Sequence, residues 1–351
     1  MCKQEVKISV CIPAYNRPEV LPALLESILS QKYGNFEIVI GEDNSPKRQE
    51  ISAVVAEYTG KYPGVIYYYE NEINLGYDGN LRNLIAKASG DYCLFMGNDD
   101  LLCADALAVV ASAVTRHKDV GVVLRTYASF DETPDNINQV FRYFQNEIFF
   151  PAGADTISVF YRRSVVISGM VLHRQEALKY HTEQFDGTLL YQLYLVANIL
   201  TRMNGVYTPQ IIALYRNGGV PDFGSSDIEK GKFTPQQQTP ESSLHFMRGM
   251  LDIAKSTERD RGVEIFQRIL LDIGNYCYPV LSIQAQQPKV VFIKYAYRLA
   301  GLGFWKNKLF YLYLISLLIL GSKRVDAVIQ RIKRRVGHTP LLGQVYRGTL
   351  K

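Results

Sequence analysis

The sequence predicts an α/β fold in which a mostly parallel sheet carries helices on both faces. Short apolar runs rich in β-branched residues alternate with amphipathic stretches of helical spacing, and polar turn residues follow each apolar run. This alternation is typical of strand–helix–strand units, whose sheets bind ligands beyond the carboxyl ends of the strands. We therefore expect the functional residues in the loops that follow the strands.

The predicted elements follow one another in order from residue 8 to residue 117. The β-rich runs predict strands at 8–12, 36–41, 65–69 and 92–96. The amphipathic stretches predict helices at 20–31, 48–58, 79–88 and 104–117. From residue 120 the pattern is mixed, and further helices are predicted at 189–200 and 244–273, with a polar linker at 234–240 between them.

Composition and charge separate a folded body from a basic tail. Hydrophobic residues make up 47% of the 351 residues and charged residues 21%, which is ordinary for a globular protein. Residues 289–351 contain thirteen Lys or Arg and one acid, Asp326, so the rest of a chain with net charge +5 is acidic. A nucleic-acid-binding domain carries positive charge on its folded body, so we expect no nucleic-acid partner.

The basic tail contains a segment that predicts membrane contact. Residues 309–320 form an apolar run between Lys306 and Lys308 on one side and Lys323 and Arg324 on the other. As a helix this run is about 18 Å long, short of the roughly 30 Å hydrocarbon layer, so we expect it to lie in the membrane interface. The alternative is a core helix with a solvated basic end.

The N-terminus and the cysteines bear on localisation. Residues 1–15 contain no apolar signal-peptide run, and the five cysteines form no CxxC pair and are odd in number. We expect a cytoplasmic protein that is peripheral at the inner face of the cell membrane. Trp305 and the basic residues of the tail would provide the contact with the membrane.

Asn98, Asp99 and Asp100 directly follow the strand predicted at 92–96. Two adjacent carboxylates at a strand end offer hard oxygen ligands for Mg²⁺ or Mn²⁺, and such an ion could bridge a diphosphate and neutralise its charge as it leaves. The alternative is a helix N-cap, because a helix is predicted from residue 104.

The other strand-end loops carry groups that suit a nucleotide. Asp43 can accept hydrogen bonds from a nucleobase or a ribose, although its segment also fits an ordinary turn. Arg17 precedes a predicted helix and forms an anion site with the exposed backbone N–H groups there, unless it is a plain surface arginine. Gly76 permits close backbone approach, and Arg82 lies on the following helix. All four loops fall at one edge of the sheet, in an order that would surround one nucleotide.

Between residues 8 and 100 the chain contains several spaced blocks, which read SVCIPAYNR at 9–17, EDNS at 42–45, NLG at 74–76, LRN at 81–83, ASGDY at 88–92 and FMGNDD at 95–100. In this order the blocks resemble the N-terminal half of family 2 glycosyltransferases, which have the GT-A fold. They cover a little over a quarter of the chain. The resemblance implies a Rossmann-like, mostly parallel sheet and a nucleotide diphosphate sugar as donor.

The resemblance also implies roles for individual residues. Pro13, Tyr15 and Asp43 would hold the base, and Arg17 and Arg82 would lie near the donor. The full donor-binding set is Pro13, Tyr15, Arg17, Asp43, Asn74, Gly76, Arg82 and Asn98. Asp99 and Asp100 would bind the metal, with Asp99 as the main ligand, because Gly97 stands where the family often has a first carboxylate.

The catalytic base is assigned by the same resemblance. Inverting members of the family take the acceptor proton with a carboxylate of the second half, commonly from a Glu-Asp pair at the start of a helix. This chain has no such pair, and its nearest candidates are Asp186, which we expect to be the base, and Glu183. A helix cap is the alternative reading of Asp186.

The predicted function is an inverting transfer of a sugar to an acceptor hydroxyl. By analogy the acceptor is a saccharide or a lipid-linked saccharide, as in O-antigen or capsule synthesis. A nucleotide-sugar-binding protein without catalysis and a sugar nucleotidyltransferase are the alternatives. The expected domains are a GT-A domain at 1–225, with a nucleotide-binding half at 1–105 and an acceptor half at 106–225, a helical extension at 226–288 and a basic amphipathic, membrane-associating tail at 289–351.

Overall fold

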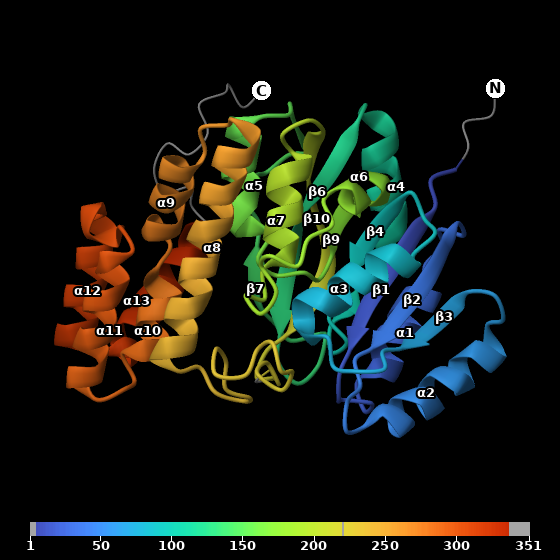
Figure 1. Ribbon diagram of the computed structural model, residues 1–351, viewed down its shortest axis with the longest axis horizontal. Coiled ribbons are helices and arrows are strands. Elements are labelled where there is room, and N and C mark those ends of the chain that lie inside the picture. The colour runs from blue at the N-terminus through green and yellow to red at the C-terminus, as the bar shows by residue number, and fades with distance from the viewer. Residues whose placement is uncertain (1–4, 220, 337–351) are drawn as a thin grey trace.

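The computed structural model describes residues 5–219 and 221–336 and centres on one sheet (Figure 1). Within these residues the sheet has ten strands in the order β3-β2-β1-β4-β9-β6-β10-β5, with β7 paired to β6 and β8 paired to β10. Helices cover both faces, and a group of C-terminal helices lies on the side away from β3. The predicted α/β fold class is confirmed.

The first four strands form the predicted parallel part of the sheet. They are β1 (Ile8–Ala14), β2 (Phe36–Glu42), β3 (Ile66–Glu70) and β4 (Tyr92–Phe95). β1 pairs in parallel with β2 and β4, and β2 pairs in parallel with β3. The carboxyl ends of these strands therefore lie at one edge, and the loops that follow them start close together.

Alternation along β1 explains why helices pack on both faces of the sheet. Val10 and Ile12 belong to the core formed with α1, α2 and α4, whereas Cys11 belongs to the core formed with α3, α5 and α7. All three side chains are fully buried, because successive residues of a strand point to opposite faces. The helices of this domain are α1 (Leu21–Leu29), α2 (Arg48–Lys61), α3 (Gly76–Lys87), α4 (Ala106–Arg116), α5 (Ala154–Arg163), α6 (Arg174–Lys179) and α7 (Tyr191–Ile199).

The second half of the sheet is mixed rather than parallel. β6 (Val120–Phe130) and β10 (Asn204–Arg216) pair in parallel, but β9 (Met170–His173) lies between β4 and β6 and is antiparallel to both. The short strands β5 (Leu101–Leu102), β7 (Ile137–Phe141) and β8 (Ile148–Phe150) are also antiparallel to their neighbours. Because β9 runs against β4, it begins where β4 ends, and its preceding loop joins the carboxyl edge of the sheet.

A buried carboxylate fixes the start of α7 against α3. Asp78 accepts hydrogen bonds from the backbone N–H groups of Thr188, Leu189 and Tyr191 at 3.0, 2.9 and 2.8 Å. The N-cap residue Leu190 makes no side-chain cap, so Asp78 takes that role for the N–H groups at the start of α7. Burial raises the pKa of Asp78 to about 6.

Two helices make up the stretch predicted as helical at 244–273. α8 (Pro240–Arg261) ends at Gly262, whose φ of 66° is left-handed, and α9 (Phe266–Asn275) follows. The two helices are separate because a left-handed glycine ends a helix. Glu258 then caps α9, since its carboxylate accepts the N–H groups of Ile265 and Phe266, both at 2.8 Å.

The remaining helices form the C-terminal group in Figure 1. They are α10 (Tyr278–Gln284), α11 (Lys289–Gly301), the 3-10 turn η1 (Phe304–Lys306), α12 (Lys308–Leu320) and α13 (Ser322–Val336). Asn307 caps α12 by accepting the N–H of Leu309 at 2.9 Å, and the helix predicted at 309–320 is confirmed.

Between residues 5 and 336, leaving residue 220 aside, we find no helix whose length and apolarity together would suffice to cross a membrane. The part of the predicted tail at 337–351 lies outside the described residues.

Candidate active site

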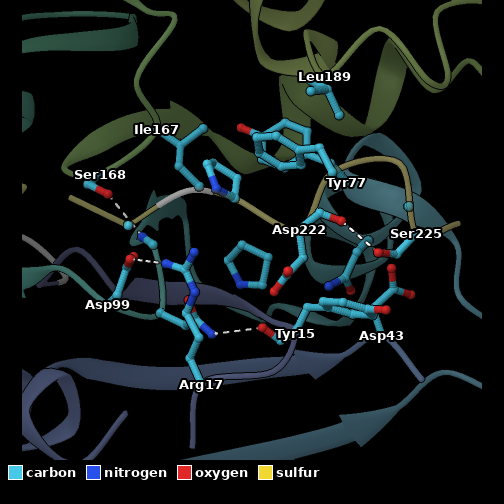
Figure 2. A pocket seen from close by; sticks show the side chains of 18 of the residues that line it. Tyr15, Arg17, Asp43, Tyr77, Asp99, Ile167, Ser168, Leu189, Asp222 and Ser225 are labelled. Atoms are coloured by element: carbon cyan, nitrogen blue, oxygen red, sulfur yellow. Dashed lines mark hydrogen bonds and ion pairs between the residues drawn. The ribbon is translucent and has the colours of Figure 1, made fainter. Parts of the chain in front are cut away.

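A cavity of about 380 Å³ lies at the carboxyl ends of β1, β2 and β4 (Figure 2). Its volume falls in the range of small-molecule sites. The structure brings most of the residues predicted for the donor and the metal to this one cavity. They are Pro13, Tyr15, Arg17, Asp43, Asn74, Gly76, Asn98, Asp99 and Asp100.

The loop after β1 turns sharply toward the loop after β4. Asn16 and Arg17 have φ angles of 53° and 60°, in the left-handed region that residues other than glycine rarely adopt. Such strain persists where the surroundings fix it and is often found at functional sites. The turn brings the guanidinium of Arg17 into an ion pair with Asp99, and the side chain of Asn98 donates to the backbone oxygens of Tyr15 and Asn16 at 3.4 and 3.3 Å.

The loop after β2 presents Asp43 at the opposite side of the cavity, as Figure 2 shows. Its Oδ1 accepts hydrogen bonds from Asn71 Nδ2 and from the N–H of Leu75, both at 2.8 Å. Burial outweighs these bonds and raises the pKa of Asp43 to about 6. Asp43 is therefore a positioned acceptor whose charge changes near neutral pH.

Gly76 allows a distant loop to close on the start of α3. Its φ is +73°, and a Cβ there would lie 2.8 Å from Ser226 Oγ and 2.9 Å from Glu229 Oε1. Glu229 in turn accepts the N–H groups of Tyr77 and Gly224, both at 2.8 Å. Glycine is required here because the backbone is left-handed and a side chain would collide with the loop around Glu229.

Asp99 and Asp100 have different surroundings. The side chain of Asp99 is 18% exposed and faces Arg17. Asp100 is buried, and its two oxygens accept hydrogen bonds from the Ser168 hydroxyl and, at 2.8 Å, from the N–H of Arg216. Burial, followed by repulsion from Asp99, raises the pKa of Asp100 to about 7. Asp99 is thus the carboxylate available to a ligand, and Asp100 is held by the protein.

The donor set tests whether a divalent ion fits this site. Within residues 5–219 and 221–336 no group of three Asp, Glu, His or Cys side chains is placed to hold a metal ion. Mg²⁺ in nucleotide sites is commonly bound by one or two carboxylates, with phosphate oxygens and waters as the other ligands. Asp99, supported by Asp100, fits that arrangement.

The segment at 217–239 contributes side chains that the sequence did not predict. Asp222 lines the cavity (Figure 2). It accepts hydrogen bonds from the side chains of Asn16 and Gln236, both at 3.2 Å. Phe223 and Glu229 line it as well. The glycines in this segment were a signal of a functional loop, but its carboxylates belong to no motif.

The structure places Arg82, Asp186 and Glu183 outside the lining of the cavity. Arg82 binds both oxygens of Asp186, at 2.7 and 2.6 Å, and also donates to the backbone oxygen of Thr182 at 2.9 Å. Glu183 is 76% exposed and lies 3.8 Å from Arg82. This geometry does not support the predicted roles of Arg82 near the donor and of Asp186 or Glu183 as base, because the carboxylate of Asp186 is committed to the guanidinium.

The fold defines an α/β domain of the GT-A type, with a cavity at the carboxyl ends of its strands. Residues 9–181 match the family model described as "Glycosyl transferase family 2". The chain therefore contains a family 2 glycosyltransferase domain.

Two curated relatives illustrate the similarity. Abequosyltransferase RfbV of Salmonella typhimurium is 35% identical over 113 residues, which are 32% of this chain and 34% of the relative. GalNAc(5)-diNAcBac-PP-undecaprenol beta-1,3-glucosyltransferase of Campylobacter jejuni is 30% identical over 104 residues, 30% of this chain and 33% of the relative. The chain thus spans about a third of the length of the curated relatives it matches.

Solved structures share the fold over most of the chain. Residues 1–349 of S. aureus TarS, in complex with UDP, superpose with a TM-score of 0.59 at 15% identity, covering 96% of this chain and 94% of that one. The mannosyltransferase PcManGT from Pyrobaculum calidifontis, in complex with GDP-Man and Mn²⁺, superposes with a TM-score of 0.50 at 13% identity, covering 96% and 89%. At these identities the similarity concerns the fold.

The raised pKa of Asp43 predicts how nucleotide binding depends on pH. If the ionised Asp43 accepts an N–H of the base, affinity falls as the pH decreases through about 6, because the protonated carboxyl loses that acceptor. Calorimetric titration with UDP and GDP between pH 5 and pH 8 measures this. The phosphates titrate in the same range, so the informative quantity is the difference between the wild type and Asp43→Asn. A difference that stays constant with pH would contradict the assignment.

Proposed function

We propose that the protein is a glycosyltransferase that moves a sugar from a nucleotide diphosphate donor to an acceptor hydroxyl with inversion. The observation that carries this proposal is the convergence of Arg17, Asp43 and Asp99, from loops after three different strands, on one cavity (Figure 2). The family 2 domain and the UDP and GDP-Man complexes of the structural neighbours support it.

The donor is proposed to lie across the cavity from Asp43 to Asp99. Asp43, Tyr15 and Pro13 would contact the base, and Arg17 would orient the diphosphate by charge-assisted hydrogen bonds. Asp99, supported by Asp100, would hold Mg²⁺ or Mn²⁺, which neutralises the charge of the leaving diphosphate. The loop around Glu229 covers the cavity and would limit the access of water.

Asp222 is the carboxylate that we propose as the base. It lies on the cavity, and its oxygens accept hydrogen bonds from two neutral amides, Asn16 and Gln236. Neutral donors orient a carboxylate without forming the strong bidentate ion pair that holds Asp186. Asp222 is thus placed to accept a proton from an acceptor hydroxyl.

The acceptor is proposed to be a lipid-linked saccharide presented at a membrane surface. The Campylobacter relative is named for an undecaprenol diphosphate-linked saccharide. In this chain, the tail helices α11, α12 and α13 and the turn η1 expose large apolar side chains that we together call the tail surface. They are Val290, Val291, Ile293, Tyr297, Trp305, Tyr311, Leu312, Ile315, Ile319, Leu320, Val328 and Ile332.

The charges around the tail surface favour an anionic lipid bilayer as its partner. Exposed basic residues lie on the same helices, including Lys294, Lys323 and Arg331. α12 is apolar on most of its surface but about 20 Å long, too short for the roughly 30 Å layer. We therefore propose peripheral attachment at the inner face of the cell membrane.

Replacing Asp99 with Ala is expected to lower metal-dependent transfer by at least about 10²-fold, because the site loses its exposed carboxylate ligand. The donor is first identified by thermal shift of the wild type with a panel of nucleotide sugars and Mn²⁺, and transfer is then measured as release of nucleoside diphosphate. Asp135→Ala, at an exposed carboxylate, is the matched control. Full activity of Asp99→Ala would refute the metal assignment. Release of pyrophosphate would favour a nucleotidyltransferase, and binding without turnover a binding protein.

Asp222→Asn is expected to lower the turnover number by about 10²- to 10⁴-fold, the usual contribution of a general base, while the donor still binds. Nucleoside diphosphate release and donor affinity are measured on the same preparation. Asp227→Asn is the control, because Asp227 lies on the same loop and its side chain is 94% exposed. Unchanged turnover in Asp222→Asn, with a loss in Asp186→Asn, would return the base to Asp186.

Ile319→Glu is expected to weaken binding to phosphatidylglycerol vesicles by about tenfold or more, because a charge replaces an apolar side chain buried in the interface. The wild type should also dissociate at high salt. Co-sedimentation with vesicles measures both effects. Ile137→Glu is the control, since Ile137 is exposed on β7 and lies outside the tail surface. Equal binding of both variants would contradict the proposal.

A further inference from the structure

A second cavity, of about 260 Å³, lies next to the first. The two cavities share a wall formed by Leu189, Pro221, Phe223 and Phe246. The rest of the second cavity is formed by the segment at 233–238 and by residues of α8 and α10. It therefore lies between the cover of the candidate donor cavity and the C-terminal helices.

The chemistry of the second cavity differs from that of the first. The first is lined by Arg17 and by carboxylates such as Asp43, Asp99 and Asp222. Among the described residues, none that lines the second cavity is charged. Its polar groups are hydroxyls and amides, from Thr234, Gln237, Gln238, Ser242, Ser243 and Gln284. Most of the lining is apolar and its polar groups are neutral, so it suits an uncharged ligand that combines apolar faces with hydroxyl groups rather than a phosphate.

In this cavity, the side chain of Gln284 has an acceptor atom that lacks a hydrogen-bond donor within the described part of the chain. Its side chain is 1% exposed, and its Nε2 donates to the backbone oxygen of Gln238 at 3.0 Å. Its Oε1 is buried and has no hydrogen-bond partner among the described residues. A buried acceptor without a partner is costly, and a ligand hydroxyl at this wall would satisfy it once the amide turns toward the cavity.

Aromatic rings line the same cavity. Phe223 and Phe233 are in edge contact at 6.5 Å between ring centroids, and Phe246 contributes to the shared wall. The apolar C–H face of a sugar packs on such rings, while its hydroxyls bind to amides and side-chain hydroxyls. The cavity thus combines the two kinds of contact that a neutral saccharide needs.

We propose that the second cavity binds the uncharged terminal sugar of the acceptor. This inference rests on the proposed transferase function and adds to it the class of acceptor and its place. Asp222 lies between Pro221 and Phe223, two residues of the shared wall, so its proposed role as base is consistent with an acceptor hydroxyl arriving from this side. The helical extension then has a function, because α8 and α10 form one side of the acceptor site.

The test measures saccharide binding by saturation-transfer NMR on the full chain with UDP present. The probes are the methyl glycosides of glucose, galactose, mannose and N-acetylglucosamine, with methyl glucuronide as the charged comparison. Ile283→Trp fills the cavity from an exposed position of α10, and Gln284→Met removes the amide at similar size. Leu271→Trp is the control, because Leu271 is exposed on α9 and lines neither cavity.

We expect at least one neutral glycoside to bind the wild type and Leu271→Trp, and to bind more strongly than the glucuronide. Ile283→Trp should lose the signal. Gln284→Met should raise the dissociation constant by about 3- to 10-fold, as expected for the loss of one hydrogen bond. Asp99→Ala should still bind the glycoside, because Asp99 lines the other cavity. Binding that survives in Ile283→Trp, or no binding of any neutral glycoside, would overturn the inference. Thermal shift with UDP in the same samples reports separately on the proposed function.

Discussion

The parallel pairing of β1 with β2 and β4 is the constraint on which the candidate site depends. It aligns Ala14 with Glu42 and Cys11 with Phe95, so the loops after the three strands leave the sheet at one edge. Val10 and Ile12 face one core and Cys11 faces the other, which favours this register, since a slip of one residue would exchange the two faces of the strand. The convergence of the loops on one cavity is thus a result of core packing.

Segments from the second half of the chain complete the cavity. The antiparallel direction of β9 brings one of them, the loop before β9, to the cavity. β9 begins where β4 ends, as the hydrogen bond from the N–H of Gly169 to the oxygen of Phe95 at 2.8 Å shows. Ser168, just before it, therefore reaches Asp100. The segment after β10 then covers the cavity through Glu229. The cavity formed by loops of the first half of the domain is thus closed by residues of its second half.

The sequence could predict those site residues whose position is set by local pattern. Arg17, Asp43 and Asp99 follow strands that are recognisable from their composition, and the sheet edge then brings them together. The ion pair of Asp186 with Arg82 could not be predicted, because Arg82 lies 104 residues away in the chain and no local signal marks it. The cavity positions of Asp222 and Gln284 depend equally on long-range packing. Gly262 is different: a glycine at the end of a charged stretch was a readable signal for a helix end.

The side chains that line the first cavity include more acidic than basic groups. The lining contains one arginine, Arg17, and several carboxylates, and Arg17 is already paired with Asp99. A diphosphate brings further negative charge, so its entry requires protons or cations. Protons can neutralise part of the negative charge, because burial raises the pKa of Asp43 to about 6 and that of Asp100 to about 7. If Arg17 turns from Asp99 to the diphosphate, Asp99 is left with an unpaired charge beside the phosphates. A divalent cation between them would balance both, and we infer that donor and metal enter this site together.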